Sequence, residues 1–136
     1  MSFPAADQMA PDAADILRLA ELARDALPDA FQPGAAAVVI AVEEMADDDL
    51  CEEMDIDSPF ELTGLYEGIP LTEKSVADQP VGPDRIILFR RAILDEWCAR
   101  GDVTLESLVA HVLVHEFAHH FGWSDDDIAA IDRWWE

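Results

Sequence analysis

The last third of the chain carries residues that could hold a metal ion and activate water. All four histidines fall in the stretch HVLVHEFAHHFGWSDDDI, which runs from His111 to Ile128. Within it, HEFAH has the spacing H-E-x-x-H, with His115, Glu116 and His119 in the defining positions. On an α-helix, residues four apart lie one above the other, so both imidazoles can reach a single tetrahedral ion.

Glu116 is the candidate general base at this site. Its position next to His115 turns it aside by about 100° around the helix, too far to bind the same ion. Its carboxylate can still reach a water molecule that the ion holds. Zinc lowers the pKa of such a water, and a carboxylate can then accept its proton during attack on a carbonyl carbon.

A second pair of histidines competes with the first, because His111 and His115 are also four residues apart. That register has Val112 in place of the base, and one ion cannot bind all three imidazoles across about 12 Å of helix rise. We therefore predict His115 and His119 as ligands. His111 is either a buried histidine with a hydrogen-bond partner or a residue that orients a metal ligand without binding the ion itself. His120 should pack near the helix C-terminus, where the dipole favours an imidazolium.

The third metal ligand is predicted among the acids that follow the helix. Gly122 can end the helix in a left-handed conformation, and Asp125 comes three positions later. The resulting pattern H-E-x-x-H-x-x-G-x-x-D matches the long metzincin-type signature, with a competent aspartate ligand in place of the third histidine. Alternatively, Asp125, Asp126 and Asp127 only complement the dipole of a following helix. Asp126 is the reserve candidate for the ligand.

Helical periodicity and cap residues predict the element that carries this motif. Thr104 is suited to begin the helix and Gly122 to end it. Most other residues between them are apolar, which is typical of a buried helix, so the polar side chains should face an internal cleft. Hydrophobic patterns predict a helix in residues 11–31, a strand in 35–45, a helical turn in 47–55, strands in 60–71 and 83–90, and a helix in 91–100.

This order of elements predicts an α+β fold with the helices packed on one face of a small sheet. The length fits a single domain over residues 1–136, of which residues 1–11 are expected to be flexible. Cys98 lies in an apolar helical context and is expected to be buried.

Composition limits the classes of partner. The sequence has 30 acidic and 8 basic residues, which give a formal net charge of −22. No basic surface is available to neutralise phosphates, so neither nucleic acids nor membrane surfaces are expected as partners. The N-terminus lacks the basic and apolar regions of a signal peptide, and no apolar run is long enough to cross a bilayer, which favours the cytoplasm.

Three stretches of the sequence resemble the small bacterial zincin-like metallopeptidases, namely TGLYEGIPLTEKS, PDRIILFRRAIL and HVLVHEFAHHFGWSDDDI. The resemblance covers the second half of the chain. It implies a minimal zincin-like α+β fold, in which a small mixed sheet packs against an active-site helix and further helices. It also implies one Zn²⁺ ion held by His115, His119 and Asp125, with Glu116 as the base.

The resemblance further implies a substrate-binding edge strand. This role would fall to Gly64, Leu65, Tyr66, Glu67 and Gly68. An exposed sheet edge offers unpaired N–H and C=O groups to an extended peptide, which makes the role physically reasonable. An ordinary edge strand broken by glycines would show the same pattern, so both interpretations stay open.

The sequence favours a zinc-dependent peptidase acting on a peptide or protein substrate, with basic or flexible peptides favoured by its acidity and small size. The alternative is a non-catalytic metal-binding or protein-interaction module on the same scaffold. Two departures from metzincins support that alternative. No methionine follows Asp125, so Trp134 or Trp135 would have to form the floor of the site. The group that would stabilise an oxyanion is also unidentified, with Tyr66 or a backbone amide as candidates.

Overall fold

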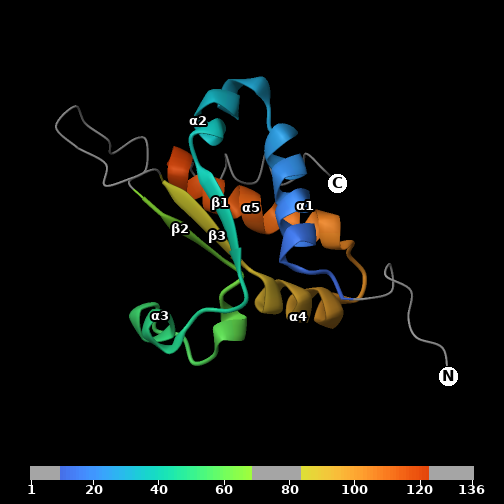
Figure 1. Cartoon of the computed structure of the whole chain (residues 1–136), viewed down its shortest axis with the longest axis vertical. Helices are drawn as coiled ribbons and strands as arrows, with labels where there is room; N and C mark the ends of the chain where they lie inside the picture. The colour runs from blue at the N-terminus through green and yellow to red at the C-terminus, as the bar shows by residue number, and fades with distance from the viewer. Residues whose placement is uncertain (1–9, 69–83, 123–136) are drawn as a thin grey trace.

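The computed structural model describes residues 10–68 and 84–122 (Figure 1). Asp125, Asp126, Trp134 and Trp135 lie outside the described residues. In chain order the elements are α1 (Ala13–Asp25), the 3-10 helix η2 (Asp29–Phe31), α2 (Gln32–Ala36), β1 (Val39–Glu43), α3 (Asp48–Glu53), the 3-10 helix η3 (Pro59–Glu61), β2 (Gly64–Glu67), β3 (Arg85–Phe89), α4 (Arg90–Arg100) and α5 (Leu105–Phe121).

The strands form one small mixed sheet in the order β1–β3–β2. β1 runs parallel to β3, whereas β2 runs antiparallel to it. Gly64 pairs with Leu88 and Glu67 pairs with Arg85, so the whole length of β2 lies along one side of β3. In the part of the chain that the structure describes, β2 is therefore an edge strand. The mixed sheet and its surrounding helices confirm the predicted α+β class.

The two faces of the sheet are covered by different helices. Ile86 and Leu88 are fully buried in the main core with residues of α1 and α5. Ile87 and Phe89 point to the opposite face and pack with Cys51 of α3. Successive residues of a strand alternate between faces, and β3 is apolar on both. The prediction that all helices pack on one face is therefore wrong for α3, because both faces of this central strand need cover.

The expectation that Cys98 is buried is also wrong. α4 buries Ala92 and Ile93, and Cys98 follows Ile93 by five residues, which places it well around the helix from that face. Cys98 is exposed, whereas Cys51 is the buried cysteine. Apolar context along the sequence did not distinguish the covered side of this short helix from its open side.

α5 is the central helix of the main core, and its predicted ends are confirmed. The Thr104 hydroxyl accepts a hydrogen bond from the Ser107 N–H at 3.0 Å. At the other end Gly122 has φ +66, and its N–H donates to the carbonyl of His119. This left-handed position favours glycine because a Cβ would be strained there. No helix among the described residues is long and apolar enough to cross a membrane.

β2 approaches α5 most closely at Gly64. A Cβ built on Gly64 would lie 2.9 Å from Cγ1 of Val112 and 3.1 Å from Cγ of Glu116. Real side chains would have to move to accept that atom. Glycine thus lets the edge strand lie directly against the turn of α5 that carries Glu116.

Gly64→Ala should lower the free energy of unfolding by about 1–3 kcal/mol, because the added methyl group overpacks this contact. Urea denaturation measures the loss. Val112→Ala removes the side-chain carbon that the new Cβ would meet, so the double variant should be more stable than the sum of the single effects predicts. Additive effects of the two substitutions would show that β2 does not pack against α5 at this point.

Candidate metal centre

The residues predicted to carry chemistry lie along the one side of α5 that is not fully buried. Val112, Leu113, Val114, Phe117 and Ala118 are buried in the core. His111, His115 and Glu116 are partly buried, and His119 is exposed. This confirms that the helix is largely buried and shows that its polar side chains open onto a cleft rather than into the core.

The rings of His111 and His115 touch each other. Their centroids are 4.4 Å apart, and the ring planes are inclined by 64°. The contact places His111 against a predicted ligand, as residues four apart on a helix should lie. A role of His111 in orienting His115 stays a prediction, because the contact is also what neighbouring rings on one helix face would make.

Glu116 lies in a partly enclosed position between α5 and β2. Burial raises its pKa from the ordinary value of 4.5 to about 7, because a charged carboxylate is poorly solvated there. The backbone N–H of Tyr66 donates to the carboxylate and opposes part of this rise in pKa. Gly64 lies against the same side chain. β2 therefore both removes water from Glu116 and gives it one fixed hydrogen bond.

A pocket of about 340 Å³ opens beside Glu116. Its polar side chains are those of Glu116 and His119 from α5. The remaining walls come from β2 and the segment before it. The lining residues are Met54, Leu62, Gly64, Leu65, Tyr66, Glu116 and His119. The pocket thus joins the predicted base and a predicted ligand to Gly64–Glu67, the part of the candidate substrate strand that forms β2.

The residue types present suit the zinc ion that the sequence predicts. His115 and His119 would supply two imidazoles from positions four apart on α5, whereas His119 but not His115 lines the pocket beside Glu116. Imidazole is a preferred zinc ligand, and a third ligand with an open position completes a catalytic site. Residues 10–68 and 84–122 contain no group of three metal-binding side chains that could hold an ion by themselves. Asp125, the predicted third ligand, lies outside these residues.

A buried polar network that the sequence did not predict lies at the C-terminal end of α5. The Tyr66 hydroxyl donates to Oδ2 of Asp84 at 2.9 Å and lies 3.1 Å from Nδ1 of His120. His120 is 1% exposed, its Nδ1 lies 3.1 Å from the Asp84 carboxylate, and its Nε2 lies 3.2 Å from the carbonyl oxygen of Gly34. The Gly34 carbonyl can only accept, so Nε2 carries a proton and donates to it, whereas Nδ1 faces both a hydroxyl and a carboxylate.

This network explains His120 better than the helix dipole alone. His120 follows the predicted ligand His119 directly, yet it points into the core and toward Asp84. The sequence signal was a histidine on an otherwise apolar helix face, and buried polar groups need partners. Its partners come from positions 34, 66 and 84, so no local pattern could identify them.

The same network occupies the side chain of Tyr66. Burial and the hydrogen bond to Asp84 raise the pKa of the phenol above its ordinary value of 10.0. The hydroxyl that was a candidate for oxyanion stabilisation is thus already engaged with two buried groups. Tyr66 contributes to the pocket beside Glu116 mainly through its backbone N–H and its place in β2.

Comparison with known families identifies the scaffold. The family model of the zincin-like metallopeptidases matches residues 35–135. The chain belongs to this family. In this zincin-like protein the matched residues include all three described strands, α4 and the whole of α5, which carries the H-E-x-x-H motif. The match begins just before β1. No curated protein matches the chain.

The raised pKa of Glu116 should make the stability of the metal-free zincin-like protein depend on pH. Between pH 4.5 and about pH 7 the unfolded chain has released a proton that folded Glu116 retains. The free energy of unfolding should therefore fall as pH rises through this window, by an amount on the order of 1–3 kcal/mol. Glu116→Gln should remove this part of the pH dependence.

Urea denaturation in the presence of a chelator, repeated across this pH range, measures the effect. Glu106→Gln is the matched control, because it makes the same change at an exposed position of α5. If the Glu116→Gln and Glu106→Gln variants follow the same pH dependence as the unsubstituted protein, the Glu116 carboxylate is not desolvated.

Proposed function

We propose that this protein is a zinc-dependent peptidase that hydrolyses peptide bonds, with Glu116 as the general base. The observation that supports this most directly is the position of Glu116. Its carboxylate lines a pocket together with His119 and accepts a hydrogen bond from β2. A general base must lie within reach of the proton that it accepts, and this position places Glu116 beside a predicted metal ligand at an open pocket.

The proposed ligands of the metal are His115, His119 and Asp125. Bound there, a zinc ion would polarise the scissile carbonyl and lower the pKa of a water molecule, which are chemical contributions that no side chain of the pocket supplies. Proton transfer is the role of the side chain of Glu116. Glu116 accepts it from the attacking water and delivers it to the leaving amine. The hydrogen bond from the Tyr66 N–H holds the carboxylate in place during both transfers.

The proposed substrate is an extended peptide or protein segment that pairs with the outer edge of β2. Apart from the Tyr66 N–H, which donates to Glu116, the Gly64–Gly68 segment would supply main-chain donors and acceptors for this pairing. The support is the direct packing of Gly64 on Glu116, which brings a bound main chain close to the base. Leu65 and Tyr66 line the same pocket, so a bound peptide would cover it and exclude water.

Glu116→Gln should reduce hydrolysis of a peptide library by about 10²–10⁴-fold, because the general base is lost while the proposed ligands remain. Zinc content by elemental analysis should stay the same. Glu106→Gln is the control for loss of one carboxylate from α5. If the zinc-loaded wild-type protein cleaves nothing in the library, the non-catalytic metal-binding module replaces the peptidase as the better account.

Asp125→Ala should weaken zinc binding by roughly 10–100-fold or more. Removing a residue that only hydrogen-bonds to a metal ligand already costs this much affinity, and Asp125 is the predicted ligand itself. A competition titration with a chromophoric chelator measures the affinity. Asp126→Ala is the matched control and tests the reserve ligand. Unchanged affinity in the Asp125 variant together with loss in the Asp126 variant would reassign the third ligand.

A further inference from the structure

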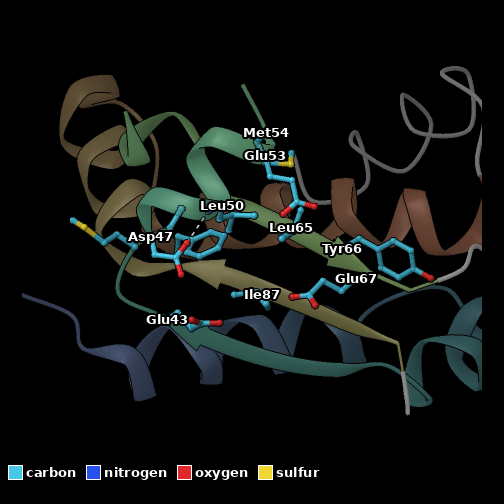
Figure 2. Close-up of a pocket in the computed structure, with 12 residues that line it drawn as sticks. Glu43, Asp47, Leu50, Glu53, Met54, Leu65, Tyr66, Glu67 and Ile87 are labelled. Carbon is cyan, nitrogen blue, oxygen red and sulfur yellow. Dashed lines mark hydrogen bonds between the residues drawn. The ribbon is translucent and has the colours of Figure 1, made fainter. Parts of the chain in front are cut away.

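A second pocket lies on the face of the sheet opposite α5, between the sheet and α3 (Figure 2). Its volume is about 430 Å³. Its apolar floor includes Ile87 and Phe89, which are 4% and 1% exposed, and Leu65 of β2 adds to it. The main core lies on the other side of the sheet, so Ile87 and Phe89 pack with α3 rather than with α5.

The rim of this pocket is acidic. Glu43, Asp47, Glu53 and Glu67 line it, and no lysine or arginine is among its described lining residues. Figure 2 shows their carboxylates arranged around Leu65 and Ile87. An apolar floor with an anionic rim complements one kind of side chain, a long apolar stem that ends in a cation. Lysine and arginine have this form and bury their stems while the charged end stays near water.

The pocket is connected to the candidate metal centre through β2. Met54, Leu65 and Tyr66 line both pockets. Gly64 packs on α5, whereas Leu65 joins the cluster on the α3 face, as alternation along a strand requires. A peptide paired with the outer edge of β2 would alternate in the same way. Side chains on one face of the peptide would lie beside Glu116, and those on the other face would lie beside the acidic pocket.

We propose that the pocket formed by β1, α3, β2 and β3 is a subsite for a lysine or arginine side chain of the bound peptide. The proposal deepens the proposed function and rests on it in one respect, because it assumes that the peptide lies along β2. The stem of the basic residue crosses Leu65, and its cationic end lies nearest Glu53 and Glu67, whose carboxylates lie beside Leu65 in Figure 2. Glu43 and Asp47 add to the negative potential across the pocket. The subsite would select peptides with a basic residue near the cleaved bond.

Two of the four acids can be changed without disturbing a described contact. Asp47 caps α3 by accepting a hydrogen bond from the Leu50 N–H at 2.8 Å, and Glu67 lies opposite Arg85 in the sheet. Glu43 and Glu53 are exposed and have neither constraint. The double variant Glu43→Gln/Glu53→Gln is therefore the test of the rim.

Glu21→Gln/Asp95→Asn is the matched control for the rim variant. Both residues are exposed and lie outside the pocket, on α1 and α4. The control makes the same change in net charge as Glu43→Gln/Glu53→Gln. It therefore separates the local effect of the rim from the general attraction of an acidic protein for cations.

Binding is measured on the full chain with Glu116→Gln in the background, so that no peptide is cleaved. The probe is a short fluorescein-labelled peptide of alanine and serine with one lysine, compared with the same peptide carrying norleucine, which has an equal stem without charge. Fluorescence anisotropy should show about three- to tenfold tighter binding of the lysine peptide at low salt. The rim variant should remove most of this preference, the control should keep it, and added salt should reduce it.

Equal binding of the two peptides would overturn the subsite and leave the pocket as an apolar docking surface. Equal losses in the rim variant and the control would also overturn it. Cleavage by the wild-type protein separates this proposal from the proposed function. Lysine-selective binding without any cleavage supports the subsite and contradicts the peptidase, whereas cleavage without lysine selectivity in either assay supports the peptidase and contradicts the subsite.

Discussion

The close packing of β2 on α5 is the contact on which the candidate site depends. Gly64 allows it, because any larger residue would meet Val112 and Glu116. The contact determines the environment of the proposed base, since it buries the Glu116 carboxylate and presents the Tyr66 N–H to it. A helix with the same H-E-x-x-H spacing but no strand against it would leave this glutamate in water, with an ordinary pKa.

The buried network of Tyr66, Asp84 and His120 holds the same strand and helix together at a second point. It joins β2, the residue before β3 and the end of α5, and through His120 it also reaches the carbonyl of Gly34. Buried polar groups of this kind are costly when a partner is lost, so each member depends on the others. The network thus restrains the end of α5 next to His119, while Gly64 restrains the turn that carries Glu116.

β2 gives this small protein two different surfaces along one strand. Its α5 face meets the proposed catalytic residues, and its α3 face meets an apolar pocket with an acidic rim. A short strand can serve both because side chains alternate between faces. The candidate site and the proposed subsite for a basic side chain would then lie on opposite faces of one edge strand.

The sequence by itself determined the spacing of the H-E-x-x-H motif and the ends of the helix that carries it. Spacing of four residues, a threonine cap at Thr104 and a left-handed Gly122 are local properties, so periodicity and cap preferences were enough to predict them. Tertiary structure decided which strand lies over Glu116, which groups surround His120, and which side of α4 is covered. These depend on contacts between segments far apart in the chain, such as Tyr66 with His120, and apolar patterning cannot specify such partners. The burial of Glu116, and with it the raised pKa, therefore followed from the fold rather than from the motif.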